Sequence, residues 1–212
     1  YLQLDRIKEL LEAFGIPRFE KEGFEADDII ATLCTRLSAE HPSLDIIIVT
    51  GDMDALQLVN DHTTVFAPKK GITDTMLYDE KMVQERYGGL TPGQLVEYKA
   101  LRGDQSDNIP GAKGIGEKTA IDLVKEFGTV EKILDVIHAK SESGTYSKAL
   151  DKIETQEEQV RMSRMLVELK YDVPIDFDIA QCRLGTYDPE RIVKIFQELS
   201  FKSLIPRLSD LP

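Results

Sequence analysis

Carboxylates gather at three places in the sequence, and their spacing limits the chemistry that the chain can do. In the stretch Leu101–Ala120, Asp104 and Asp107 stand three residues apart, and a glycine-rich turn follows them. Carboxylate oxygens bind hard divalent cations. A glycine turn that leads into a helix offers backbone N–H groups to a phosphate. The two features side by side predict a metal-dependent enzyme that holds a nucleic-acid backbone.

Two further acidic clusters come earlier in the chain. Residues 23–28 lie at the expected start of a helix, and residues 50–54 directly follow a β-branched run at 45–50. Ligands of open α/β sheets bind beyond the carboxyl ends of the strands, which is where the second cluster would lie. The carboxylates of the two clusters are Glu25, Asp27, Asp28, Asp52 and Asp54.

Each cluster also has a purely structural interpretation. Acidic residues in the first turn of a helix stabilise its dipole. Asp54 is placed to cap a short helix at 55–59, and Asp107 is placed as an N-cap before Asn108. Spacing of three residues puts Asp104 and Asp107 on one face if they lie in a helical turn. Both interpretations stay open for any one cluster, and the three clusters together favour a metal site.

Seven carboxylates at three points of a fold suit two divalent cations. Two such ions about 3.5–4 Å apart can clamp a phosphodiester, and Mg²⁺ prefers octahedral oxygen ligands. The histidines are scattered at positions 41, 62 and 138, so the sequence does not predict a histidine-rich zinc site. Nucleophilic triads and Walker-type phosphate loops also find no support in the sequence.

The glycine turn has a chemistry of its own. Glycines let the backbone approach a phosphate closely or adopt positive φ, and a helix–turn–helix pair of this form contacts the backbone rather than the bases. The alternative is an ordinary tight connection between two helices. The candidate DNA-binding residues are Gly111, Ala112, Lys113, Gly114, Ile115, Gly116, Lys118 and Thr119.

Hydrophobic periodicity predicts an α/β first half and a largely helical second half. We place the boundary between residues 97 and 98, with an α/β catalytic core at 1–97 and a helical subdomain at 98–212. The run at 45–50 predicts a parallel strand buried on both faces, and 63–66 and 72–78 are weaker strands. A helix at 156–170 is expected to turn Met162, Met165, Leu166 and Leu169 inward. The other expected helices are 4–14, 26–38, 80–87, 91–101, 117–127, 130–137 and 192–199.

Composition excludes several classes of protein. The net charge of −12 argues against non-specific coating of nucleic acid, and a hydrophobic content of 42% supports a real core. No apolar run reaches membrane-spanning length, and the N-terminus lacks a signal-peptide pattern. Cys34 and Cys182 are too few for a disulfide framework. We therefore expect a reducing, cytoplasmic setting and no membrane partner.

The three clusters carry a resemblance to a known family. The motifs are GFEADD at 23–28, TGDMD at 50–54 and YKALRGDQSDNIPGAKGIGEKTA at 98–120. They closely resemble the 5′→3′ exonuclease domain of bacterial DNA polymerase I, a member of the flap-endonuclease family. The resemblance extends over essentially the whole chain. It implies a PIN-like or resolvase-like central sheet flanked by helices, followed by a helical subdomain with a helix–three-turn–helix (helix-hairpin-helix type) DNA-binding module.

The resemblance also implies an activity and its ligands. Such a domain cleaves 5′ flaps and removes nucleotides from 5′ ends of duplex DNA in replication and repair, with two Mg²⁺ ions for which Mn²⁺ can substitute. A K⁺ ion is implied at the turn, beside Gly111, Ala112 and Ile115. The residues that match the metal-site carboxylates are Glu25, Asp27, Asp28, Asp52, Asp54, Asp104 and Asp107. Among these, the expected catalytic residues are Asp27, Asp52, Asp54 and Asp107.

The sequence departs from the family at its start. The family has a preceding strand with a further metal-site Asp and a helical arch, and this sequence begins just after the arch. We therefore expect weak or no nuclease activity from this chain alone, and the longer parent chain, in which a polymerase domain could follow, to be active. The alternatives are a DNA-junction-binding module without activity and a PIN-type ribonuclease. The glycine turn and the helical second half argue against the ribonuclease.

Overall fold

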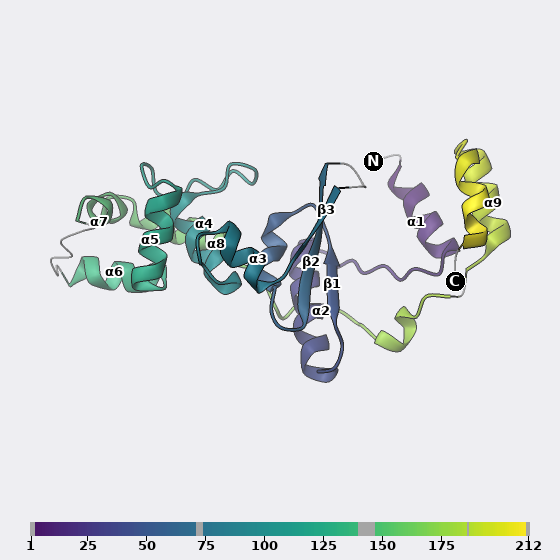
Figure 1. Cartoon of the computed structure of the whole chain (residues 1–212), viewed down its shortest axis with the longest axis horizontal. Helices are drawn as coiled ribbons and strands as arrows, with labels where there is room; N and C mark the ends of the chain where they lie inside the picture. Colours follow the sequence, from purple (N-terminus) through teal and green to yellow (C-terminus); the bar gives the residue numbers. More distant parts are fainter. Residues whose placement is uncertain (1–2, 71–73, 140–146, 186, 211–212) are drawn as a thin grey trace. The chain divides into compact units, whose positions relative to one another are not determined.

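The structure is a computed structural model that describes residues 3–70, 74–139, 147–185 and 187–210 (Figure 1). Contacts divide the chain into two compact units, one formed by Tyr1–Phe24 with Pro174–Pro212 and the other by Glu25–Val173. The larger unit contains all three acidic clusters and the glycine turn. The first two residues of the predicted strand 72–78 lie outside the described residues.

The described strands of the larger unit form a mixed sheet with the order β1-β2-β3. Strand β1 runs parallel to β2, and β2 runs antiparallel to β3. Helix α2 and the 3₁₀ helix η1 pack with the sheet around one core, which contains Ala31, Ile48, Leu56 and Val65. The strands are β1 (Ile46–Val49), β2 (Thr63–Lys70) and β3 (Asp74–Tyr78), with α2 at Ala26–Glu40 and η1 at Met53–Leu58.

Strand β1 confirms the parallel pairing but not the burial that its sequence predicted. Ile46 and Ile48 face the core, whereas Ile47 is 60% exposed and Val49 is 73% exposed. In the described sheet β1 lies at the edge, and α2 and η1 cover one face only. A continuous β-branched run indicates a strand, but it does not reveal how many faces are covered.

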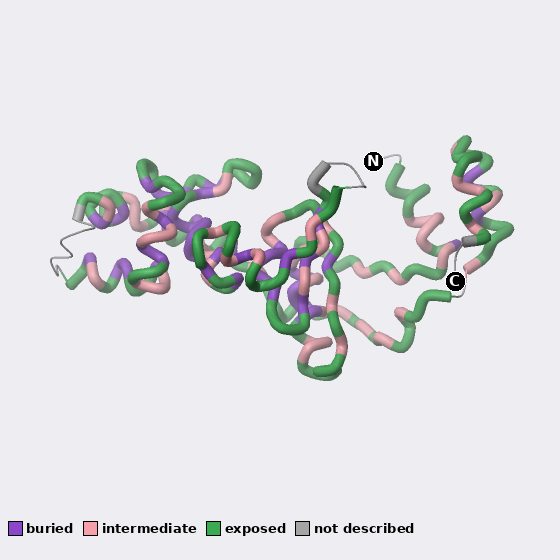
Figure 2. The backbone as a smooth tube through the Cα atoms, in the orientation of Figure 1, coloured by how far each residue is buried: buried purple, intermediate pink, exposed green. Residues whose placement is uncertain are grey.

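The second core of this unit lies among helices α4, α5, α6, α7 and α8, where Figure 2 shows many residues coloured as buried. Leu101, Leu123 and Ile133 are fully buried there. Helix α4 bridges the two cores, because its Leu95 belongs to the sheet core and its Tyr98 to the helical core. The elements are α3 (Glu80–Arg86), η2 (Pro92–Gln94), α4 (Leu95–Arg102), α5 (Glu117–Phe127), α6 (Val130–His138), α7 (Ser147–Glu154) and α8 (Glu157–Val167).

Helix α8 presents a different face to the core from the one that its sequence predicted. Met162, Met165 and Leu166 are exposed, whereas Leu169 lies beyond the end of the helix and packs against the sheet core. The buried residues are instead Val160, Ser163 and Val167. The prediction was wrong because it followed side-chain size, whereas the buried Ser163 hydroxyl accepts a hydrogen bond from the backbone N–H of Gly111 at 3.1 Å.

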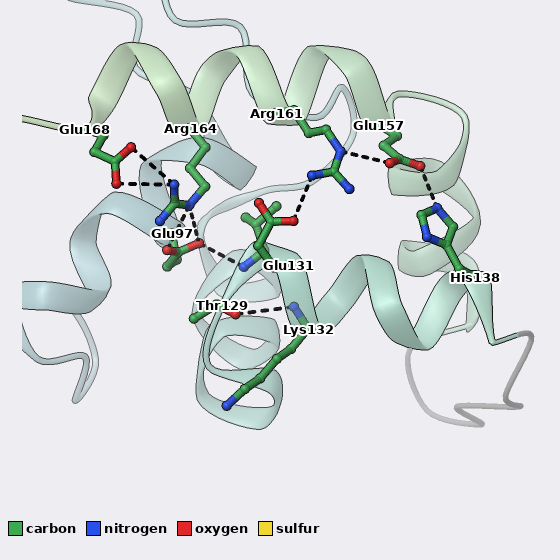
Figure 3. A network of polar contacts seen from close by, with 10 residues as sticks. Glu97, Thr129, Glu131, Lys132, His138, Glu157, Arg161, Arg164 and Glu168 are labelled. Atoms are coloured by element: carbon green, nitrogen blue, oxygen red, sulfur yellow. Dashed lines mark hydrogen bonds and ion pairs between the residues drawn. The ribbon is translucent and has the colours of Figure 1, made fainter.

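A buried carboxylate ties three of these helices together (Figure 3). Glu97 of α4 is 5% exposed. It accepts hydrogen bonds from the backbone N–H of Val130, at the start of α6, at 2.8 Å and from Nε of Arg164, on α8, at 3.1 Å. A carboxylate at a helix N-terminus satisfies donors that the helix itself cannot. Nearer the surface, Arg161 of α8 pairs with Glu131 and Glu157.

The smaller unit joins the two ends of the chain. Its core contains Ala13, Ile192, Ile195 and Phe196. The backbone N–H of Asp188 donates to the carbonyl of Ala13 at 2.8 Å. Its elements are α1 (Leu4–Ala13), η3 (Ile179–Cys182), α9 (Pro189–Glu198) and η4 (Lys202–Asp210). The domain boundary between residues 97 and 98 falls within α4 and stays a prediction.

Within the described ranges, no helix has the length and apolar character needed to cross a membrane.

The Glu97 contacts predict unequal roles for two arginines on α8. We expect Arg164→Met to lower the free energy of unfolding by about 3 kcal/mol, because it leaves a buried carboxylate without its ionic partner. Arg161→Met, three residues away, removes an arginine that is 45% exposed and is expected to cost little. Urea unfolding of both variants measures the difference. Equal losses would contradict the buried role of Glu97.

Candidate metal centre and glycine turn

Three carboxylates from two distant motifs converge in the structure. Asp54, Asp104 and Asp107 each offer an oxygen, and these oxygens lie within 4.8 Å of one another. Asp54 follows β1 in the first turn of η1, whereas Asp104 and Asp107 follow the end of α4. The sequence placed all three in one metal site, and the fold brings them together.

The second cluster is held by a cap on η1. Oδ1 of Asp52 accepts a hydrogen bond from the backbone N–H of Asp54 at 2.9 Å, which makes Asp52 the N-cap. The backbone N–H of Asp52 in turn donates to the Thr50 hydroxyl at 3.0 Å. The structural interpretation of the sequence, one of the two left open, had placed the cap at Asp54. Because Asp52 takes that role, the Asp54 side chain is left to turn toward the other acids.

The third cluster lies in a tight loop rather than in the helical turn that its spacing suggested. The backbones of Asp104 and Ile109 exchange two hydrogen bonds, of 2.9 and 2.8 Å. Asn108 closes the loop with a φ of 57°, in the left-handed region that Asn tolerates better than most residues. The loop holds Asp104 and Asp107 together without a helix.

Two glycines let this loop close on itself. Gly103 and Gly111 have φ values of 81° and 58°. A Cβ on Gly103 would lie 2.7 Å from the carbonyl oxygens of Ile109 and Pro110, and a Cβ on Gly111 would overlap the backbone at Arg102 and Gly103. At these two positions one stretch of backbone lies directly against another, which leaves no room for a side chain. This contact fixes the acidic loop to the start of the glycine turn.

Lys99 is a site residue that the sequence motifs do not predict. It lies on α4 and is only 6% exposed. Its ammonium is paired with Asp104 at 2.7 Å and with Asp54. The signal that could have found it is a lysine in a helix whose neighbours Tyr98, Ala100 and Leu101 are all apolar and buried. A buried lysine requires an anionic partner.

The carboxyl of Asp104 is strongly held in its ionised form. Burial alone would raise its pKa, but hydrogen bonds from Lys99 and from Ser106, together with the lysine charge, outweigh that effect and lower the pKa to about 2. Ser106 donates to Oδ1 of Asp104 through its backbone N–H at 3.0 Å and also through its hydroxyl.

The opposite shift occurs at Asp27, in the first turn of α2. Burial raises its pKa, and the charges of Asp52, Glu25, Asp28 and Asp107 raise it further. Residues of all three motifs thus lie close enough to act on this one carboxyl. Like charges held together in this way are relieved by a cation.

Asp28 and Glu25 have structural roles at the start of α2. They form a reciprocal capping box, in which Oδ2 of Asp28 accepts from the backbone N–H of Glu25 at 3.2 Å. Oδ1 of Asp28 accepts from the backbone N–H of Lys170 at 2.9 Å. Both oxygens of Asp28 are therefore engaged by backbone donors. Metal binding by these two residues stays a prediction.

The glycine turn is held by the two helices that follow α6. Gln156 pairs with the backbone of Lys113, accepting from its N–H at 2.7 Å and donating to its carbonyl at 3.2 Å. The Lys152 ammonium donates to the Gly114 carbonyl at 3.0 Å, and the Gln159 amide donates to the Gly111 carbonyl. The sequence of α7 and α8 indicates no chemistry for this region, and no spacing of residues there predicts these contacts.

The turn ends at Gly116, the N-cap of α5. Gly116 has extended backbone, and a Cβ there would meet no atom within 4 Å. The described fold therefore leaves open space at the start of α5, where the first backbone N–H groups have no intrahelical partner. Such an N-terminus favours a phosphate.

Oxygen is the only donor type in the acidic triad, since no histidine or cysteine belongs to it. That donor set fits a hard divalent cation. An oxygen-only cluster that is followed in the chain by an open helix N-terminus is the arrangement expected of one class of protein, the metal-dependent enzymes that act on phosphodiester backbones.

Comparisons with known proteins give the family. The model of the 5′-3′ exonuclease N-terminal resolvase-like domain matches residues 1–88, and that of the 5′-3′ exonuclease C-terminal SAM fold matches residues 90–190. The chain therefore belongs to the 5′-3′ exonuclease family, as its motifs predicted. It is 45% identical to DNA polymerase I of Chloroflexus aurantiacus over 95% of this chain and 21% of that protein. It thus spans about a fifth of that relative's length.

Solved structures agree with this assignment. T5 5′-exonuclease with bound divalent zinc ions is 28% identical, with a TM-score of 0.59 over 72% of this chain and 53% of that one. A variant T5 D15 flap endonuclease in a pseudo-enzyme–product complex with DNA and metal ions is 25% identical, with a TM-score of 0.57 over 90% and 62%. These neighbours share the α/β sheet and helical architecture that the sequence predicted.

The close backbone contact between Gly103 and Gly111 predicts that Gly111 cannot be replaced without a large loss of stability. We expect Gly111→Ala to lower the free energy of unfolding by about 3 kcal/mol, because the methyl group meets backbone and the residue keeps a positive φ. Gly93→Ala is the matched control, since a Cβ there meets nothing within 4 Å. Urea unfolding compares the two, and a loss at Gly111 no larger than at Gly93 would contradict this close contact.

The raised pKa of Asp27 predicts a stability cost of the metal site. Above the ordinary value of 3.8, the unfolded chain releases this proton more readily than the folded one, so folding is less favourable there. We expect Asp27→Asn to be more stable than the parent at pH 7 in EDTA. The gain should vanish below pH 3.8, where both states are protonated. Thermal unfolding at the two pH values measures it, and a gain that does not depend on pH would contradict the assignment.

Proposed function

We propose that this chain carries the metal site and the DNA-binding turn of a 5′→3′ exonuclease that also cuts 5′ flaps, a hydrolase that acts on DNA phosphodiesters in replication and repair. The single observation that carries the proposal is that Asp54, from η1, converges with Asp104 and Asp107, which lie on the loop that leads into the glycine turn. Because the backbones of Gly103 and Gly111 lie against each other, the loop that carries Asp104 and Asp107 is tied to the start of the turn.

The carboxylates would hold the divalent ions of the reaction. Bound Mg²⁺ ions would activate the attacking water and neutralise charge on the phosphodiester. Asp54, Asp104 and Asp107 supply one group of oxygens, and Asp27 and Asp52 supply charge to the same region. Asp52 keeps Oδ1 on the backbone N–H of Asp54 and can turn its other oxygen to a cation. We take Asp27, Asp52, Asp54 and Asp107 as the catalytic residues, with Glu25, Asp28 and Asp104 as further candidate ligands.

The glycine turn would hold the DNA backbone. Hydrogen bonds with four side chains hold the protein backbone of the turn in place. These side chains are Lys152, Gln156, Gln159 and Ser163. The exposed N-terminus of α5 would receive a phosphate, and Lys113 and Lys118 would add charge-assisted contacts. The DNA and metal ions bound by the T5 flap endonuclease support a DNA substrate for this chain.

Several finer assignments belong to the same proposal. Mg²⁺ is the proposed metal and Mn²⁺ a substitute, in keeping with an all-oxygen donor set. K⁺ at the turn is proposed on the resemblance alone, and the carbonyls of Gly111 and Ala112 already accept hydrogen bonds from Gln159 and from the backbone of Ile115. The relatives are bacterial DNA polymerases several times longer. We accordingly propose a polymerase domain as a partner in the same polypeptide and a bacterial cytoplasmic, nucleoid-associated location.

A 5′-labelled flap duplex tests the proposal. Binding is measured in Ca²⁺ by fluorescence anisotropy, and cleavage is measured in Mg²⁺ on the same substrate. We expect flap DNA to bind in preference to single-stranded DNA, and any cleavage to fall at the junction. Asp107→Asn should lower cleavage at least about a hundredfold, because bound ions contribute several kcal/mol to transition-state stabilisation. It should leave binding in place, since the turn is intact.

The outcomes separate the alternatives. Junction binding without cleavage would favour a junction-binding module and agree with the weak activity expected of this chain alone. Preferential cleavage of RNA that lacks a junction would favour a PIN-type ribonuclease. Failure to bind junction DNA would overturn the proposed role of the turn.

A further inference from the structure

Lys99 pairs with two of the three converging carboxylates, Asp54 and Asp104. Its side chain is 7% exposed, and its ammonium is within ion-pair distance of Asp54 and of Asp104, the latter at 2.7 Å. Those two residues belong to the group whose oxygens lie within 4.8 Å of one another. The ammonium is therefore a positive charge built into the acidic triad by the chain itself.

The same lone pairs serve either the ammonium or a metal ion. Lysine offers three N–H donors and accepts nothing, so each of its contacts uses a carboxylate oxygen. Oδ2 of Asp104 accepts from Lys99, and Oδ1 of Asp104 accepts from Ser106. Both oxygens of Asp104 thus have donors, and Oδ1 of Asp54 has Lys99. A divalent cation bound by both residues has to compete with the lysine.

We propose that Lys99 is an internal counter-ion of the cation site, which holds Asp54 and Asp104 together in the metal-free protein and withdraws when a divalent cation binds between them. This proposal rests on the proposed metal site, and it adds that the Lys99 ammonium competes with the metal ion for that site. Lys99 is a positioning residue in this role. It lowers the affinity of the position it occupies, and it stabilises the fold when that position holds no metal.

Helix α4 makes this exchange possible. Lys99 lies in the last turn of α4, one turn before Gly103, and the backbone N–H of Gly103 donates to the Lys99 carbonyl at 2.8 Å. The backbone of Lys99 is thereby fixed, while its four-carbon side chain keeps rotatable bonds. The ammonium can leave the carboxylates by side-chain rotation without disturbing the loop that holds Asp104 and Asp107.

Titration calorimetry with Mn²⁺ as the probe tests the competition. Lys99→Met keeps the length and apolar stem and removes the charge. We expect this variant to bind Mn²⁺ roughly tenfold more tightly or better at the position concerned, because a unit charge a few ångströms from a divalent ion is removed. In EDTA it should unfold at a lower urea concentration than the parent, and saturating Mn²⁺ should reverse that loss.

Arg102→Met is the matched control. Arg102 lies in the same helical turn and is exposed, with its guanidinium 5.8 Å from the centre of the Tyr98 ring rather than on a carboxylate of the triad. Its loss should change Mn²⁺ affinity far less than the loss of Lys99. Mn²⁺ binding that is unchanged or weaker in Lys99→Met overturns the counter-ion role. Absence of Mn²⁺ binding in the unsubstituted 212-residue chain overturns the proposed metal site as well.

A measurement on the parent protein covers the case in which Lys99→Met does not fold. An ammonium held in two ion pairs exchanges slowly with water, so its ¹⁵N-correlated NMR signal should be visible in EDTA and absent from Lys99→Arg. We expect Mg²⁺ to remove or strongly shift that signal. A Lys99 signal that is missing in EDTA, or that saturating Mg²⁺ leaves unchanged, overturns the proposal.

Discussion

The repulsion between carboxylates is the constraint on which the rest of the structure depends. The charges of Asp52, Glu25, Asp28 and Asp107 all raise the pKa of Asp27, so residues of three separate motifs lie within range of one another. The chain offsets this repulsion with groups of its own. Backbone N–H groups donate to Asp28, Asp52 and Asp104, and the Lys99 ammonium lies between Asp54 and Asp104. The remaining repulsion is centred on Asp27, where burial and the neighbouring negative charges both raise the pKa of the carboxyl.

The acidic loop and the glycine turn are one mechanical element. The crossing of Gly103 and Gly111 ties the loop to the turn, and the two backbone hydrogen bonds between Asp104 and Ile109 close the loop itself. The turn is also held by hydrogen bonds with Lys152 of α7, with Gln156, the N-cap of α8, and with Gln159 and Ser163 of α8. Glu97 adds a buried link between α4, α6 and α8 (Figure 3). A phosphate bound at the turn would therefore be fixed relative to the carboxylates, as a reaction at a phosphodiester requires.

The sequence predicted the parts of the molecule that depend on local pattern. The acidic motifs, the parallel strand and most of the helices follow from spacing and periodicity, whereas helix α7 was not predicted. The errors arise where one distant contact decides the outcome. Ser163 is buried on α8 in place of Met162 and Met165 because its hydroxyl meets the backbone of Gly111, a partner 52 residues away. Ile47 and Val49 were predicted to be buried, but they lie on the face of the sheet that α2 and η1 do not cover. A β-branched run does not reveal how many faces of its sheet are covered. Lys99 was passed over because a lysine is read as a surface residue until its partners are known.

An acidic residue in these clusters can be both a helix cap and a metal ligand. The hydrogen bonds that its carboxylate oxygens already accept indicate which of the two roles it fits better. A carboxylate with one oxygen on a backbone N–H keeps its orientation and still has an oxygen to offer, as Asp52 does at the start of η1. Asp28 has both oxygens on backbone donors, from Glu25 and Lys170, so its first role is to fix the start of α2 and the chain after α8. Asp104 is intermediate, because one of its oxygens is held by Ser106 and the other by a lysine that a cation can replace. Capping thus supplies the rigid orientation that a cation site needs, and an acidic residue at a helix start can be a cap and a ligand at once.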